Sequence, residues 1–313
     1  MDIVCCIDNK YAKYCAVTLV SLFENNKGEK LNIHIIALSL SDEIKSVLKN
    51  LVEKTYKQEI FIYEIGENEI IKKFPYKKNS HINISTYIRL FLPETLPQSL
   101  SKVLYIDCDI IIRNSIKELW NIDISDYALG AVEDMFSTKA NNYERLDYVN
   151  TDSYFNAGVL LINLDYWRKN FVQEKLIGYI LENSEKLKFY DQDALNAVLH
   201  NQKLLMPFKW NIQDGFYRIE RHIRQDAWEE LDKEIENPAV IHYTGSKKPW
   251  HYKSQHPHKS EYFRYLDMTQ WAGERPKKDY VAMAILKLRP IAVALKLDKP
   301  RYKKITKDKT SNG

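Results

Sequence analysis

The run Val103-Leu104-Tyr105-Ile106-Asp107-Cys108-Asp109-Ile110-Ile111-Ile112 has the composition of a buried strand in an α/β sheet, interrupted by two carboxylates one residue apart. Burying ionised carboxylates is costly unless a cation, a metal or strong donors compensate. At the carboxyl end of such a strand, an Asp-x-Asp pair can reach a hard divalent metal and, through it, a phosphate. The alternative is a strand end with two solvated or capping aspartates, and the tripeptide alone does not decide between them.

Composition is that of an ordinary globular protein. The chain has 313 residues, 45% hydrophobic and 28% charged, enough for one large domain or two small ones. It contains no apolar run of 18 residues and no basic segment leading into an apolar core near Met1, so we expect neither a transmembrane helix nor a secretory signal, and a cytoplasmic protein. The four cysteines, Cys5, Cys6, Cys15 and Cys108, lack a paired CxxC pattern, which favours buried reduced thiols over disulfides or a zinc site.

Strands and helices alternate along the first two thirds of the chain. We expect strands at residues 3–7, 31–38, 59–65, 103–112 and 128–132, then at 159–162, 207–210 and 240–243, with helices following Tyr11 and over 42–55. This order predicts a mostly parallel, doubly wound sheet with helices on both faces. No GxGxxG or GxxxxGK[ST] motif is present, which argues against a dinucleotide or P-loop site.

Polar segments lie beside several of these strands. Residues 80–90 indicate a loop entering a helix, and Phe155-Asn156-Ala157-Gly158 puts small residues where a backbone or ligand could approach closely. Tyr190-Asp191-Gln192-Asp193 places acids before an apolar helix pattern, for which N-capping is the plain explanation. The turn from His242 to His251 is unusually rich in His, Lys and Trp.

The last segment differs from the rest. Residues 276–313 contain eleven Lys or Arg against three Asp, whereas residues 1–275 are net acidic, at −4. Short apolar blocks at 280–286 and 291–295 alternate with these basic residues, and this favours an amphipathic segment on anionic lipid over a helix packed on the core. We expect residues 301–313 to be disordered. The predicted organisation is a domain at 1–270 and a basic C-terminal segment at 271–313.

A metal site, a lysine and a flexible backbone segment would together form a diphosphate clamp. His242, at a strand end, is the best third metal ligand beside Asp107 and Asp109. Lys248 could bind a phosphate as a point charge, with the Gly245 backbone free to approach it. Tyr11 could stack on a base and Asp8 could accept from its ring NH, although a helix-capping Asp and a core Tyr are the plain alternatives. Departure of a nucleoside diphosphate is the chemistry that such a clamp favours.

Six segments carry a family resemblance: MDIVCCIDNKY, HINISTYIRLFLPE, KVLYIDCDIIIR, YFNAGVLLINLDYWR, FYDQDALN and HYTGSKKPWH. In order and spacing they resemble glycosyltransferase family 8, in particular the bacterial lipopolysaccharide and lipooligosaccharide α-galactosyl- and α-glucosyltransferases, over roughly residues 1–270. The resemblance implies a GT-A fold, a UDP-hexose donor and Mn²⁺, with Mg²⁺ as an alternative. It also implies transfer with retention of anomeric configuration to a cell-surface glycan or glycolipid.

The resemblance also assigns roles to residues of this chain. It implies that Asp107, Asp109 and His242 bind the metal, that Asp8 and Tyr11 contact uridine, and that Gly245 and Lys248 bind the diphosphate. The residues that it places around the donor, with the catalytic pair last, are His81, Thr86, Arg89, Cys108, Asp134, Asn156, Ala157, Asp191 and Gln192. The chain departs from the family at Lys10, where relatives often carry Asn, and at Thr244, where some carry Cys.

Retention sets a mechanistic question, because a double displacement needs a nucleophile and Gln192 is a poor one. The preferred interpretation is front-face attack, in which the leaving phosphate oxygen takes the acceptor proton. Two other functions stay open: a nucleotidyltransferase, although the segment from Asp8 to Tyr14 lacks the expected Gly-rich loop, and a non-catalytic sugar-nucleotide-binding protein. A nucleic-acid partner is not expected, because the tail lacks interleaved aromatics. Peripheral contact with the cytoplasmic face of the inner membrane is expected through the tail.

Overall fold

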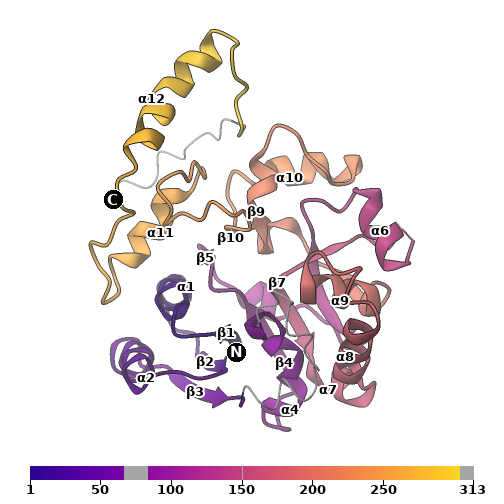
Figure 1. Cartoon of the computed structure of the whole chain (residues 1–313). Coiled ribbons are helices and arrows are strands. Elements are labelled where there is room, and N and C mark those ends of the chain that lie inside the picture. Colours follow the sequence, from indigo (N-terminus) through magenta and orange to yellow (C-terminus); the bar gives the residue numbers. More distant parts are fainter. Residues whose placement is uncertain (67–83, 150, 304–313) are drawn as a thin grey trace.

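A seven-stranded sheet forms the centre of the computed structural model, which describes residues 1–66, 84–149 and 151–303 (Figure 1). The strands lie in the order β3-β2-β1-β4-β7-β6-β8, and all run parallel except β7, which is antiparallel to both of its neighbours. The predicted mostly parallel sheet is therefore confirmed. Its strands are β1 (Asp2–Ile7), β2 (Asn32–Ala37), β3 (Glu59–Glu64), β4 (Lys102–Ile106), β6 (Leu129–Glu133), β7 (Phe155–Asn163) and β8 (Lys203–Leu205).

The apolar run around Asp107 belongs to two sheets, so the prediction of one strand over residues 103–112 is wrong. β4 ends at Ile106, the chain turns through Asp107, Cys108 and Asp109, and β5 (Ile110–Ile112) continues in a second sheet. There β5 pairs antiparallel with β10 (Val240–His242), which pairs in parallel with β9 (Ile212–Gln213). Both halves of the run are buried, so the apolar pattern continues across the turn and gives no sign of the break.

Helices cover both faces of the large sheet. Alternate residues of each strand face opposite sides, so that Ile3, Cys5 and Ile7 of β1 join the core beneath α1 while Val4 joins the core beneath α8 and α9. The helices are α1 (Ala12–Glu24), α2 (Asp42–Lys49), the π-helix η1 (Asn50–Thr55), α4 (Leu92–Thr95), α5 (Lys117–Trp120), α6 (Ala140–Leu146), α7 (Leu164–Lys169), α8 (Val172–Glu182), α9 (Tyr190–Leu199), α10 (Trp228–Glu234), α11 (Lys259–Leu266) and α12 (Tyr280–Ala294), with 3₁₀ helices η2 (Ile84–Phe91), η3 (Phe208–Trp210), η4 (Asp214–Tyr217) and η5 (Gln225–Ala227).

Two further expectations differ from the structure. Pro207 to Trp210 is not a strand: Phe208–Trp210 form the 3₁₀ helix η3, in which Phe208 and Trp210 are buried and Lys209 is half-buried. The predicted disorder from residue 301 is wrong for residues 301–303. Tyr302 forms an antiparallel bridge with Arg218, and its hydroxyl donates to Asp214 Oδ1 at 2.7 Å. Residues 304–313 lie outside the described residues. The C-terminal segment thus returns to the body of the protein after α12.

Candidate active site

The directions of the strands bring the polar residues to the same edge of the sheet. Asp107 follows β4 and Asp134 follows β6, so both lie where these parallel strands end. Because β7 runs the other way, its first residues, Asn156 and Ala157, lie at the same edge. A cavity of about 320 Å³ opens there, lined by eleven residues that the sequence analysis singled out, ten as site residues and Thr244 as a departure: Arg89, Asp107, Asp109, Asp134, Asn156, Ala157, Asp191, Gln192, His242, Thr244 and Lys248.

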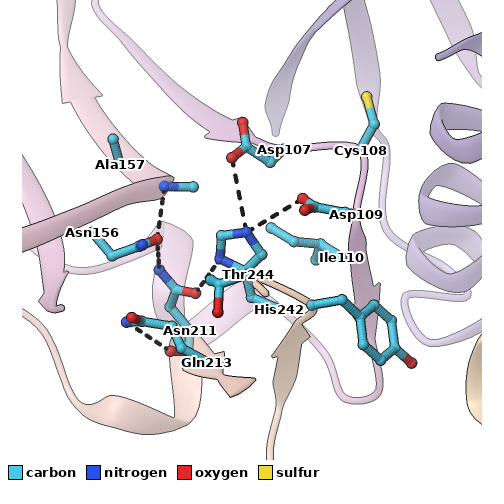
Figure 2. A network of polar contacts seen from close by, with 12 residues as sticks. Asp107, Cys108, Asp109, Ile110, Asn156, Ala157, Asn211, Gln213, His242 and Thr244 are labelled. Atoms are coloured by element: carbon cyan, nitrogen blue, oxygen red, sulfur yellow. Dashed lines mark hydrogen bonds and ion pairs between the residues drawn. The ribbon is translucent and has the colours of Figure 1, made fainter. Parts of the chain in front are cut away.

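Asp107, Asp109 and His242 converge with ligand atoms within 4.8 Å of one another. His242 Nε2 lies 3.3 Å from Asp109 Oδ1 and 3.8 Å from Asp107 Oδ2 (Figure 2). The other ring nitrogen, Nδ1, lies 2.9 Å from Asn211 Oδ1, and this contact directs Nε2 towards the carboxylates. Two carboxylates and an oriented imidazole form a donor set that a divalent cation accepts, so these residues fit a metal.

The absence of a side chain at Gly158 leaves the space that the His242 ring occupies. A methyl group added at Gly158 would lie 2.1 Å from His242 Cε1 and 3.0 Å from Asp107 Oδ2. The close approach expected at this small-residue segment is therefore made by the imidazole of His242, and any side chain at 158 would displace it.

Lys248 supplies positive charge at the same point. Its ammonium hydrogen-bonds to Asp109 Oδ2 and, at 2.5 Å, to the carbonyl oxygen of Tyr243. Burial by itself would raise the pKa of Asp109, but Lys248 and His242 outweigh burial and hold that pKa well below its usual range. Asp109 therefore stays ionised and ready to accept a cation.

Arg89 joins the metal-site carboxylates to the far wall of the cavity. Its guanidinium donates to Asp107 Oδ1 at 3.0 Å and to the carbonyl oxygen of Ala157 at 2.7 Å, and it pairs with Asp191 Oδ2 at 2.8 Å. The guanidinium also lies over the ring of Tyr105, whose hydroxyl donates to Asp107 Oδ1 at 2.6 Å. Two donors thus hold Oδ1 of Asp107, and Oδ2 is the oxygen nearer His242.

Asp191 is a buried carboxylate on α9. Burial raises its pKa to about 6, with Asp107 adding to the shift and Arg89 opposing it. The N-cap residue of α9 is Phe189, and the Asp191 carboxylate, one residue inside the helix start, accepts from the backbone nitrogens of Asp191 and Gln192. Asp191 therefore combines contacts to the start of the helix with the ion pair to Arg89.

Gln192 has both ends of its amide engaged. Its Oε1 accepts from the Ala157 and Asn156 nitrogens at 3.1 and 3.2 Å, while Nε2 donates to Asp134 Oδ2 at 3.2 Å and to Tyr154 Oη at 3.1 Å. Asp134 also accepts from Asn156 at 3.0 Å, and burial raises its pKa. This network fixes the orientation of the Gln192 amide at the cavity wall.

Asp193, which the sequence analysis did not select, holds the turn before Gln192. The carboxylate accepts from the backbone nitrogens of Lys188 and Phe189 at 2.6 Å and from Arg145 at 2.6 and 2.8 Å. Tyr190 adopts φ 47°, a strained conformation for an aromatic residue, in the same turn. A fully buried carboxylate with these donors can hold such a turn in place.

Other predicted residues lie outside the cavity lining. Asp8 Oδ1 accepts from the Tyr11 backbone nitrogen at 2.9 Å, so its side chain caps the turn, while the Tyr11 ring is 44% exposed and is not a core side chain. Gly245 lies against Asp214. Cys108 directs its sulfur away from His242 (Figure 2). His81 lies outside the described residues, and for Thr86 only its place in η2 is described.

Asn211 is the main residue that the sequence analysis missed, together with Gly158 as a packing requirement. Asn211 stands between Trp210 and β9, in no motif, and it becomes visible only because β9 pairs with β10 beside His242. Its amide nitrogen donates to Asn156 Oδ1 at 2.9 Å, so it links the metal-site histidine to the donor-side wall.

Comparison with known proteins agrees with this geometry. The sequence profile described as Glycosyl transferase family 8 matches residues 2–254. The chain is 33% identical over 279 residues to "General stress protein A" of Bacillus subtilis, covering 87% of this chain and 94% of the relative. It is 34% identical over 280 residues to a "Lipopolysaccharide 1,2-glucosyltransferase" of Escherichia coli, covering 87% and 79%.

A crystal structure of the galactosyltransferase LgtC in complex with donor and acceptor sugar analogues superposes with a TM-score of 0.77 at 26% identity, covering 88% of this chain and 98% of LgtC. The expected GT-A fold is thus confirmed, with the β5-β10-β9 sheet as an addition that the sequence did not predict. From its profile match, its relatives and its fold, this chain belongs to glycosyltransferase family 8 and is a glycosyltransferase related to the lipopolysaccharide glycosyltransferases.

Proposed function

We propose that the protein transfers an α-hexose, galactose or glucose, from a UDP-sugar to a lipopolysaccharide-type glycan with retention of configuration, using Mn²⁺ or Mg²⁺. The observation that carries the proposal is the convergence of Asp107, Asp109 and His242 beside Lys248 at the edge of the sheet. Asp107, Asp109 and His242 would hold the cation, which when bound supplies neutralising charge for the departing diphosphate.

The remaining residues bind and orient the donor. Lys248 is placed to exchange its contact with Asp109 for a phosphate oxygen. Arg89, Asp134 and Asn156 line the wall where the hexose would lie. Asp8 and Tyr11 are proposed to contact the uridine, and Tyr11, which is 44% exposed, is accessible for stacking on the base.

The wall of the cavity favours front-face attack over double displacement. Asp191 is engaged by Arg89 at 2.8 Å, and Gln192 is held by four hydrogen bonds, so neither is a free nucleophile. The acceptor oxygen bonds to the anomeric carbon as the bond from that carbon to the phosphate oxygen breaks, and the leaving phosphate oxygen takes the acceptor proton. Gln192 stabilises the positive charge at the sugar. A sugar adduct trapped on Asp191 or Gln192 would contradict this mechanism.

The C-terminal segment is proposed to hold the enzyme on an anionic membrane surface. Val281, Ile285 and Leu288 of α12 are 58% to 70% exposed and share one helical face. The C-cap residue Leu295, 64% exposed, continues this face, and exposed lysines flank it. No helix among the described residues is long and apolar enough to cross a bilayer. A basic helix with an exposed apolar face suits a lipid-linked acceptor at a membrane surface.

The test is metal-dependent release of UDP from UDP-galactose and from UDP-glucose, without acceptor and then with lipopolysaccharide-type glycans. We expect release from one donor, with Mn²⁺, faster with acceptor and absent in Asp109→Asn. Binding of UDP without release from either donor would contradict the transferase proposal and support the non-catalytic alternative.

A further inference from the structure

Three cysteine sulfurs meet behind the Asp107–Asp109 turn. Cys5 lies on β1, Cys15 on α1 and Cys108 within the turn, and their sulfur atoms all lie within 4.8 Å of one another. All three are free thiols, 0%, 0% and 6% exposed. Residues far apart in sequence thus place three soft ligand atoms at one buried point.

The surroundings of this cluster are apolar, so the sulfur atoms are its main ligand atoms. All three residues belong to the apolar core beneath α1, among Ile7, Leu19 and Ile106. The thiol of Cys15 contacts those of Cys5 and Cys108, and the Cys108 sulfur lies 4.0 Å from the carbonyl oxygen of Cys6. The side chain of Cys6 packs in the core on the other face of the sheet, so it is not part of the cluster.

The burial and the number of sulfurs decide which ion fits. Zn²⁺ favours four ligands in a tetrahedron, one more than this cluster supplies. Cu⁺ accepts three sulfurs but leaves net negative charge on its thiolates, which is costly in an apolar interior beside two aspartates. Trivalent arsenic takes three thiolates in a pyramid and the product carries no charge. We propose that Cys5, Cys15 and Cys108 form a binding site for trivalent arsenic, the thiophile that three buried thiols can hold as a neutral complex.

The reaction balances without an oxidant. Arsenous acid, As(OH)₃, exchanges its three As–O bonds for three As–S bonds, and the three thiol protons leave with the hydroxides as three waters. Because the thiols are buried, binding requires local opening of the turn or of α1 and is expected to be slow.

The cluster is connected to the candidate active site through the backbone of Cys108. Thr18 on α1 donates to the carbonyl oxygens of Cys108 and Ile110, at 3.0 and 2.8 Å, so α1 holds the turn that carries Asp107 and Asp109. Drawing the Cys108 sulfur onto arsenic would shift these carboxylates. Binding is therefore expected to inhibit donor turnover, a consequence that rests on the proposed function, whereas the binding itself does not.

The test uses arsenous acid on the reduced full chain. We expect one arsenic per protein, with three sulfur neighbours by X-ray absorption at the arsenic edge. In Cys5→Ala and Cys15→Ala the affinity should fall at least tenfold, and in Cys6→Ala, the matched control, it should stay unchanged. Fewer than three sulfurs on arsenic in the wild-type protein would overturn the proposal, whether or not the variants fold. Equal affinity in folded Cys15→Ala would do the same.

A second measurement separates arsenic binding from its proposed inhibition of turnover. Turnover of the wild-type protein should fall with arsenous acid and return with a small dithiol, while Cys15→Ala keeps its own turnover under the same treatment. Arsenic bound by three sulfurs without inhibition would support the site and remove the proposed link to the turn. Binding data remain decisive even if no sugar donor is ever turned over.

Discussion

The candidate active site is tightly packed, whereas helix α12 is largely exposed. In the site, Asp109, Arg89 and Gln192 are each held by several named partners, and the groups around them are buried. Along α12, Ala282 is the one buried residue among its described residues, and its large apolar side chains are mostly exposed. Figure 1 shows this helix away from the central sheet. The first region is built for fixed geometry, and the second leaves an apolar face free for a partner outside the chain.

This difference means that single substitutions should act in different ways in the two regions. In the site, one added methyl group or one lost hydrogen bond moves a ligand atom and reduces turnover. On α12, a substitution removes exposed apolar area, so the fold and the chemistry should be preserved while surface binding changes.

Among substitutions that leave the metal ligands themselves unchanged, Gly158→Ala should have the largest effect, because the new methyl group would lie 2.1 Å from the His242 ring and must displace it. We expect kcat/KM for the sugar donor to fall by about 10²-fold, the lower range for loss of one electrostatic stabiliser. The matched control is Gly178→Ala on α8, where nothing lies within 4 Å and helix propensity predicts stabilisation of about 0.5 to 1 kcal/mol. Similar kinetics in the two variants would show that His242 does not need its observed position.

Asn211→Ala should have the next largest effect, since it removes the acceptor that lies 2.9 Å from His242 Nδ1. Loss of such a partner typically lowers metal affinity or activity by about 10- to 100-fold. The loss should be smaller at saturating Mn²⁺ if the defect is in metal binding. A defect that does not respond to Mn²⁺ would indicate that Asn211 acts elsewhere, for example through Asn156.

His256 allows a test of a buried group that belongs neither to the cavity lining nor to α12. Its ring packs against Tyr217 and Tyr243 and lies near Tyr302. Burial lowers its pKa to about 3, with Asp214 opposing the shift. The unfolded chain takes up the proton near pH 6.5, so stability from this group falls as the pH drops from 6.5 towards 3. Between pH 6.5 and 4.5 the loss should be about 2 kcal/mol.

The measurement is urea unfolding over that pH range in the wild-type protein and in His256→Asn, which retains an acceptor for the His258 backbone nitrogen. The variant should be less stable at pH 7 but show a shallower dependence on pH. Equal slopes for the two proteins would mean that His256 is protonated in the folded state.

The smallest effect on chemistry is expected from Ile285→Asp with Leu288→Asp on α12, because both side chains are exposed. Turnover of a water-soluble acceptor should change less than twofold, while binding to vesicles containing anionic lipid should fall several-fold. Lys209→Asp on η3 changes the net charge by the same two units outside α12, and this variant should bind vesicles more strongly than the double variant. Unchanged vesicle binding in the double variant would contradict the membrane proposal.

The sequence predicts which residues form this site better than it predicts how they are arranged. Asp107, Asp109, His242, Arg89 and Gln192 stand in motifs, and the structure brings them to one cavity. The reversal of β7 and the break between β4 and β5 could not be predicted, because both depend on which strands pair and not on local pattern. Asn211 could not be found for the same reason, since its role exists only once β9 lies beside β10.

Binding of Mn²⁺ in the presence of UDP is the most direct test of the central claim, that Asp107, Asp109 and His242 form a metal site for a sugar nucleotide. Calorimetry and electron paramagnetic resonance should detect one Mn²⁺ per chain in the wild-type protein. In Asp109→Asn, of nearly equal volume, we expect the affinity to fall by at least about 10-fold. Equal Mn²⁺ affinity in the two proteins would contradict the account, because the cation would then be held by other residues.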